Sequence, residues 1–140
     1  MNPFSRHLQQ LRSCSGLRQS ELAALVGYEQ SYLSALEAGV KGPPTAEFVS
    51  RLSLALQLTE SQINELQDIV EASQRRYVLP IDCSEEVFYL FRELRTCLPG
   101  LPTDEAKLLT GFLRLMRERA GTSFAQKNSP DSPRKAEAQM

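Results

Sequence analysis

Apolar residues recur along this chain at spacings of three and four, the periodicity of helices, and no stretch sustains the alternation of a half-buried strand. A first helix is predicted to begin at Pro3, because Asn2 is a good N-terminal cap and proline is tolerated at the first helical position. It should end near Gly16, since glycine readily adopts the left-handed conformation that closes many helices. Its apolar residues fall on one face: Phe4, Leu8 and Leu11.

The pattern predicts four further helices in the first half of the chain, at residues 19–26, at 30–38, from residue 46, and from residue 60 to 75 or 76. Gly27 marks a tight turn between the first two of these. Thr45 can cap the next helix, and Thr59 with Gln62 has the spacing of a capping box for the last. A loop rich in glycine and proline, residues 39–44, lies in the middle of this series.

The second half is predicted to hold a helical hairpin that follows a short extended segment. Asp82 and Glu85 have the spacing of a capping pair, and Thr103 can cap the last helix. Two short helices cannot bury so much apolar surface between themselves, so they need the first half of the chain, a second copy or another protein. We predict a homodimer whose interface contains Phe88, Phe91, Leu94, Leu98, Leu109, Phe112 and Met116.

These elements predict an all-α chain: a five-helix domain at 1–76, a helical dimerisation or interaction region at 77–120, and a tail at 121–140. The tail is mostly serine, proline, lysine, alanine and glutamine. Such a composition has too little apolar surface to fold, so the tail is expected to be disordered.

Composition excludes several classes of site. No apolar run reaches the length of a membrane span, and the first twelve residues lack the apolar stretch of a signal peptide, so we expect a cytoplasmic protein without membrane contact. Cys14, Cys83 and Cys97 are far apart and His7 is the sole histidine, so no zinc-site spacing occurs. We expect reduced thiols, no metal and no cofactor. Paired carboxylates, a catalytic cysteine–histidine group and a phosphate loop are also lacking, which argues against an enzyme.

One stretch carries a specific signal, because many positions match a single pattern over about 45 residues. It reads Leu8-x-x-Leu11-Arg12, then Gly16-Leu17-x-Gln19-x-x-Leu22-Ala23, then Gly27, then Leu33-x-x-Leu36-Glu37-x-Gly39. This stretch resembles the helix-turn-helix of the Cro/phage-repressor (XRE) family. The resemblance implies a five-helix, phage-repressor-like domain that binds operator DNA, often as a dimer, with its third helix in the major groove.

The resemblance also implies roles for single residues. Gln30, Ser31 and Ser34 would face base edges and Ala35 a thymine methyl, while Gln19 would contact the DNA backbone. The residues expected near phosphates are Tyr32, Lys41 and Arg18. The resemblance further implies a partly buried ion pair between Arg12 and Glu37. An ordinary solvated helix face is the alternative for the polar residues of the third helix.

Two departures from the family pattern bear on DNA binding. Arg18 stands where a serine or threonine would cap the second helix, which removes a side-chain acceptor worth about 1 kcal/mol. Glu29 precedes the third helix, where its carboxylate suits the helix dipole but repels nearby phosphate. The net charge of −1 gives no basic excess, so any DNA contact depends on the local placement of a few groups.

The sequence therefore predicts a DNA-binding transcriptional regulator that acts as a homodimer on an inverted-repeat operator. One alternative is an antitoxin whose C-terminal helices bind a toxin while its first domain represses its own operon. Another is a protein-interaction module that has lost DNA binding, which Glu29 and the pI of about 5.9 favour.

Overall fold

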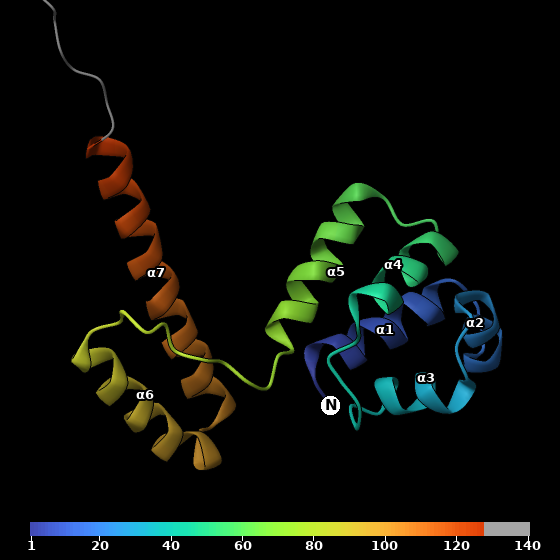
Figure 1. Ribbon diagram of the computed structural model, residues 1–140, viewed down its shortest axis with the longest axis horizontal. Coiled ribbons are helices and arrows are strands. Elements are labelled where there is room, and N and C mark those ends of the chain that lie inside the picture. The colour runs from blue at the N-terminus through green and yellow to red at the C-terminus, as the bar shows by residue number, and fades with distance from the viewer. Residues whose placement is uncertain (128–140) are drawn as a thin grey trace, which may run out of the picture. The chain divides into compact units, whose positions relative to one another are not determined.

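A computed structural model describes residues 1–127 of the chain, with side chains up to residue 121, and this part is helical with no strand. The chain divides into two compact units (Figure 1). The boundary follows Leu79, three residues beyond the predicted boundary at 76. Along residues 1–127, no helix is long and apolar enough to cross a membrane.

The first unit contains the five expected helices: α1 (Pro3–Cys14), α2 (Gln19–Val26), α3 (Gln30–Glu37), α4 (Ala46–Ala55) and α5 (Glu60–Ala72). The predicted caps set three of their starts. The side-chain oxygens of Asn2, Thr45 and Thr59 accept hydrogen bonds from backbone N–H groups three residues on. The Gln62 side chain also accepts from the Thr59 backbone N–H at 2.9 Å, which completes the predicted capping box.

The fifth helix ends at Ala72, earlier than the predicted end at 75 or 76. Ser73, which is 4% exposed, accepts a hydrogen bond from the Phe4 backbone N–H at 2.9 Å and donates to the Ile69 carbonyl at 2.7 Å. This contact joins the end of α5 to the start of α1. The prediction was wrong because a bond across 69 residues of sequence leaves no local signal.

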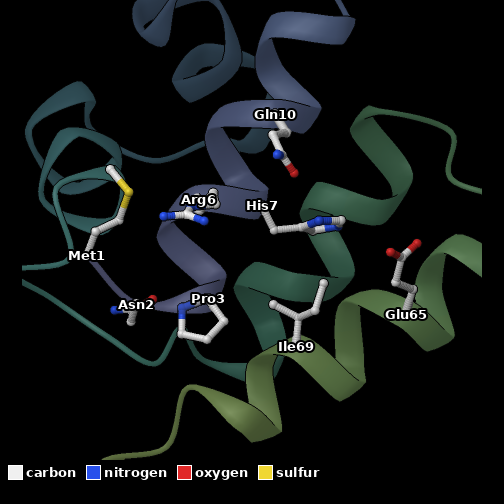
Figure 2. Close-up of a pocket in the computed structure, with 8 residues that line it drawn as sticks. All are labelled: Met1, Asn2, Pro3, Arg6, His7, Gln10, Glu65 and Ile69. Atoms are coloured by element: carbon white, nitrogen blue, oxygen red, sulfur yellow. The ribbon is translucent and has the colours of Figure 1, made fainter. Parts of the chain in front are cut away.

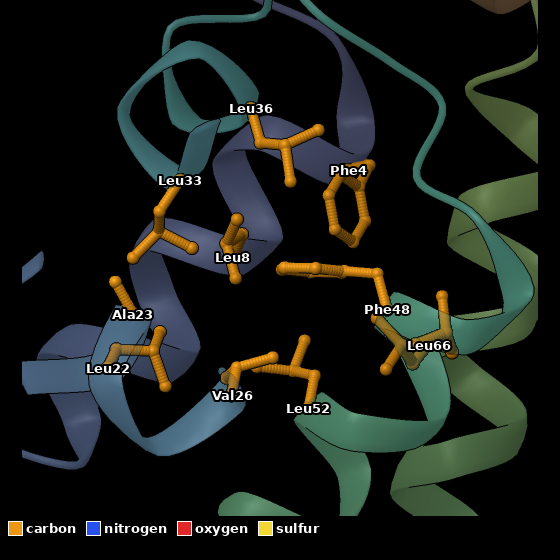
Figure 3. Packing of buried hydrophobic residues seen from close by; sticks show 11 residues of the cluster. Phe4, Leu8, Leu22, Ala23, Val26, Leu33, Leu36, Phe48, Leu52 and Leu66 are labelled. Carbon is orange, nitrogen blue, oxygen red and sulfur yellow. The ribbon is translucent and has the colours of Figure 1, made fainter. Parts of the chain in front are cut away.

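One hydrophobic core holds the five helices together (Figure 3). Its two largest rings, Phe4 from α1 and Phe48 from α4, meet edge to face with centroids 6.4 Å apart. Every helix of the unit contributes to the core, so the site on α2 and α3 lies on a packed scaffold. The core members are Phe4, Leu8, Leu22, Ala23, Val26, Leu33, Leu36, Phe48, Val49, Leu52 and Leu66.

The second unit contains α6 (Glu85–Cys97), the 3₁₀ turn η1 (Leu98–Gly100) and α7 (Thr103–Lys127). The predicted Asp82 and Glu85 capping pair is wrong: Ser84 is the N-cap residue, and its side chain makes no capping hydrogen bond. Capping-box spacing shows only that such bonds can form. Here the N-cap residue lies two positions after Asp82.

Helix α7 continues past residue 121, where the sequence predicted a disordered tail to begin. Gly121 alone does not end the helix, because glycine in a helix interior costs only about 1 kcal/mol relative to alanine. The first proline beyond it is Pro130. The rest of the predicted tail, residues 128–140, lies outside the described residues.

Candidate nucleic-acid interface

Helices α2 and α3 are joined by a tight turn at Gly27. This glycine has φ of 79°, a left-handed conformation that side-chain-bearing residues adopt at a cost. Its backbone N–H and that of Tyr28 both donate to the Ala23 carbonyl, at 2.9 and 3.0 Å. A Cβ at this position would lie 3.2 Å from Nη1 of Arg51, a tight contact that this flexible side chain can relieve by a small shift, so the backbone conformation is the main reason for glycine.

Helix α3 has one buried and one exposed face. Leu33 and Leu36 are buried in the core, whereas Gln30, Ser31 and Ser34 are exposed. Three predicted base-reading side chains therefore share the solvent face of the helix that the resemblance assigns to the major groove. Ala35, predicted to meet a thymine methyl, is half-buried.

Arg12 and Glu37 form an ion pair that joins α1 to the end of α3. Arg12 donates from Nε to one carboxylate oxygen at 2.6 Å and from Nη2 to the other at 3.1 Å. The Glu37 side chain is 3% exposed and that of Arg12 is 21% exposed. The hydrogen bond to Glu37 raises the pKa of the Arg12 guanidinium above its ordinary value. Arg12 also donates to the Leu17 carbonyl at 3.0 Å, so the pair fixes the segment between α1 and α2.

Gln19, predicted to contact the DNA backbone, takes part in this same network. Its side-chain amide donates to Oε2 of Glu37 at 2.8 Å, and the residue is half-buried. The bond holds the first residue of α2 against the last residue of α3. One N–H of the amide is thus used within the protein, which orients the group at the start of α2.

An aromatic cluster lies beside the start of α3. The rings of Tyr28 and Tyr32 stack with centroids 5.1 Å apart, and both meet Phe48 edge to face. Lys41 Nζ lies 5.3 Å from the centre of the Tyr32 ring, and the Arg51 guanidinium lies 5.4 Å from that of Tyr28. Two cations are therefore held over two stacked rings next to α3.

Sequence reasoning placed Tyr32 and Lys41 in the site but missed Tyr28 and Arg51. The spacing of four between the tyrosines was an available signal, because such residues can meet at the start of a helix. Arg51 gave none, since it lies 23 residues from Tyr28 and meets it only through the packing of α4 on the helix-turn-helix. Burial, with a smaller effect from Tyr28, raises the pKa of Tyr32, so its hydroxyl is neutral at physiological pH.

Carboxylates lie close to the same surface. The Arg18 side chain makes no capping bond, and Glu21 accepts from the Arg18 backbone N–H at 2.7 Å, which partly replaces the missing cap. Glu29 is the N-cap residue of α3, is exposed, and makes no side-chain capping bond. These acidic groups offset part of the positive charge that Arg18 and Lys41 bring to the surface.

The predicted interface residues of the second unit are all at least partly exposed. Phe91 and Leu94 are half-buried, and Phe88, Leu98, Leu109, Phe112 and Met116 are 44–61% exposed. Among the side chains described in this unit, residues 80–121, none is buried. The unit thus presents apolar side chains that a single copy leaves in contact with water.

A separate pocket of about 480 Å³ lies between α1 and α5 (Figure 2). Its charged and polar lining includes Arg6, His7, Gln10 and Glu65. It contains no residue predicted to contact DNA. No group of three or more metal-ligating side chains occurs in the part of the chain that the structure describes.

Comparison with known proteins finds a family match within the first unit. Residues 3–66 match the family model of the helix-turn-helix domain. A solved complex of SinR protein with SinI protein aligns with 82% of this chain and 98% of that chain, at 21% identity and a TM-score of 0.42. No curated protein matches the chain in sequence.

Proposed function

Because residues 3–66 match the family model of the helix-turn-helix domain, we propose that this chain is a sequence-specific transcriptional regulator that binds an inverted-repeat operator as a homodimer. The observation that carries the proposal is the exposed polar face of α3 on a fully packed scaffold. Gln30, Ser31 and Ser34 lie on that face, while Leu33 and Leu36 anchor the helix.

In this proposal the polar residues of α3 read bases. A glutamine in the major groove can make paired hydrogen bonds to adenine, and serine accepts several bases. Gln19, Tyr32, Lys41 and Arg18 would fix the domain on the DNA backbone, which sets register without reading sequence. Ala35 is half-buried, so only part of its methyl group could meet a thymine.

Two observations support the proposed dimer. The net charge is −1 and carboxylates adjoin the binding face, so one domain neutralises few phosphates and should bind DNA weakly. The second unit exposes apolar side chains that a second copy can cover. Joining two domains raises the effective concentration of the second on the same duplex.

Selection of bound sites from random duplex DNA tests the function. We expect an enriched inverted repeat with half-sites about 10 bp apart, or a multiple of that spacing, because two-fold symmetry places the recognition helices in successive turns of the major groove. Recovery of unrelated sequences would contradict sequence-specific binding. It would favour the alternative of a protein-interaction module.

Variants on the selected site then separate the two kinds of contact. Gln30→Ala should relax preference at one base pair and weaken cognate binding by about 1–3 kcal/mol. Lys41→Ala is the control, because loss of a phosphate contact should weaken all sequences alike. An unchanged preference after joint replacement of Gln30, Ser31 and Ser34 would contradict the assignment.

A further inference from the structure

The aromatic cluster beside α3 points to an additional DNA contact. We propose that Arg51 of α4 binds a backbone phosphate next to the recognition helix, from a position fixed by the Tyr28 ring, and that Glu47 competes with the phosphate for it. The inference rests on the proposed function, and it adds a residue that lies outside α2, α3 and the loop after them.

Packing fixes where the Arg51 side chain lies. Its guanidinium is 5.4 Å from the centre of the Tyr28 ring, and its Nη1 lies over the turn at Gly27. The Tyr28 ring stacks on Tyr32 and rests edge-on against Phe48, which is fully buried. An arginine of α4 is thereby placed at the turn that leads into α3.

Lys41 lies over the ring of Tyr32, much as Arg51 lies over the ring of Tyr28. Its Nζ is 5.3 Å from the centre of the Tyr32 ring, as Arg51 is from Tyr28. Two cations, each over a ring of the same stack, thus lie beside one end of the recognition helix. Fixed cations of this kind recognise the phosphates of a DNA backbone.

The exposure and chemistry of Arg51 suit a phosphate. Its side chain is 47% exposed, so a ligand can reach it. A guanidinium over an aromatic ring keeps its planar set of N–H donors, and such a fork matches phosphate oxygens. The ring also reduces the conformational freedom that the side chain would lose on binding.

Glu47 is one turn away on α4 and already occupies part of this donor set. Its Oε1 accepts from Nη2 of Arg51 at 2.8 Å, and its side chain is 66% exposed. The carboxylate neutralises Arg51 and repels a nearby phosphate. An exposed pair of this kind contributes little to stability, so DNA can displace the carboxylate at small cost.

The test measures DNA affinity of the full chain against salt concentration, on the selected duplex. Each phosphate contact contributes about −0.9 to the slope of log K against log salt concentration. Arg51→Gln should make this slope less negative by about 0.9 for each bound domain and leave the preferred sequence unchanged. Arg6→Gln removes the same charge at the pocket between α1 and α5, so it controls for net charge and should keep the wild-type slope.

Replacement of the competing carboxylate should change DNA affinity in the opposite direction. Glu47→Gln should tighten DNA binding severalfold, and Glu65→Gln, an equal charge change on α5, should have a smaller effect. Thermal unfolding of each variant checks that the domain is folded. A wild-type slope for Arg51→Gln, or equal effects of the two glutamate variants, would overturn the proposal while sequence-specific binding stands. Absence of duplex binding by the wild-type chain would overturn both.

Discussion

The two units of this chain are built from helices of similar amphipathic pattern, yet they bury their apolar residues very differently. Residues 1–79 bury eleven hydrophobic side chains in one core contributed by five helices. In residues 80–121, no side chain is buried, although this stretch includes four phenylalanines and tyrosines. Helical periodicity therefore predicts where helices form, whereas burial depends on how many elements can surround them.

Helix α6 shows the difference most clearly. Val87, Phe91 and Leu94 are half-buried, but Leu90, which lies on the same side one turn before Leu94, and Tyr89, on the opposite side of the helix, are exposed. A helix with apolar residues on several sides is normally enclosed by more than one neighbour. The proposed second copy of the chain would supply such neighbours, and the following predictions test this contrast between the units.

The largest expected effect is loss of the dimer when the second unit is removed or altered. Light scattering should show a dimer for the full chain at tens of micromolar and a monomer for residues 1–79, which have their own core. Phe112→Glu should make the full chain monomeric, because a charge is costly in an apolar interface. Leu54→Glu places the same charge at an exposed leucine of the first unit and should leave the dimer intact. A monomeric full chain would rule out this interface.

Breaking the ion pair of the first unit should have the next largest effect. Arg12→Ala leaves the Glu37 carboxylate, 3% exposed, without its charged partner and should lower the free energy of unfolding by about 3–5 kcal/mol. Glu47→Ala is the matched control, since its pair with Arg51 is exposed and worth at most about 1 kcal/mol. Denaturant titration measures both. A loss below about 0.5 kcal/mol for Arg12→Ala would show that the carboxylate is solvated.

Truncation of one leucine in each unit compares the two environments directly. Leu66→Ala removes a fully buried side chain of the core and should cost about 2–5 kcal/mol. Leu108→Ala removes a side chain that is 74% exposed and should change stability by less than about 0.5 kcal/mol. Chemical denaturation of both variants at one protein concentration is the measurement. Equal losses would mean that the second unit has a core of its own.

Helix caps should show the smallest difference. The Thr59 hydroxyl accepts from the Gln62 N–H at 3.3 Å, so Thr59→Ala should cost about 1 kcal/mol. Ser84 occupies the corresponding position of α6 without a side-chain capping bond, so Ser84→Ala should be nearly neutral. Thermal unfolding of the two variants distinguishes these outcomes. A comparable loss for Ser84→Ala would indicate a cap that forms only in the assembled protein.

Local sequence determined much of the first unit because its signals act over three or four residues. Asn2, Thr45 and Thr59 cap the helices they were expected to cap, and Gly27 adopts the left-handed conformation that the turn needs. The exposed polar face of α3 likewise follows from its periodicity. The roles of that face on DNA remain predictions.

Tertiary structure decided the features that join distant positions. Ser73 at the end of α5 accepts a hydrogen bond from Phe4, Gln19 bonds to Glu37, and Arg51 lies over Tyr28. Each contact spans 18 or more residues, so no spacing within the sequence indicates it. The sequence by itself thus determined the helices and the helix-turn-helix pattern, because caps, turns and periodicity are local. Only the packing of α1, α4 and α5 on α2 and α3 decided which charged and aromatic groups meet beside α3, since burial and cation placement depend on the positions of all five helices together.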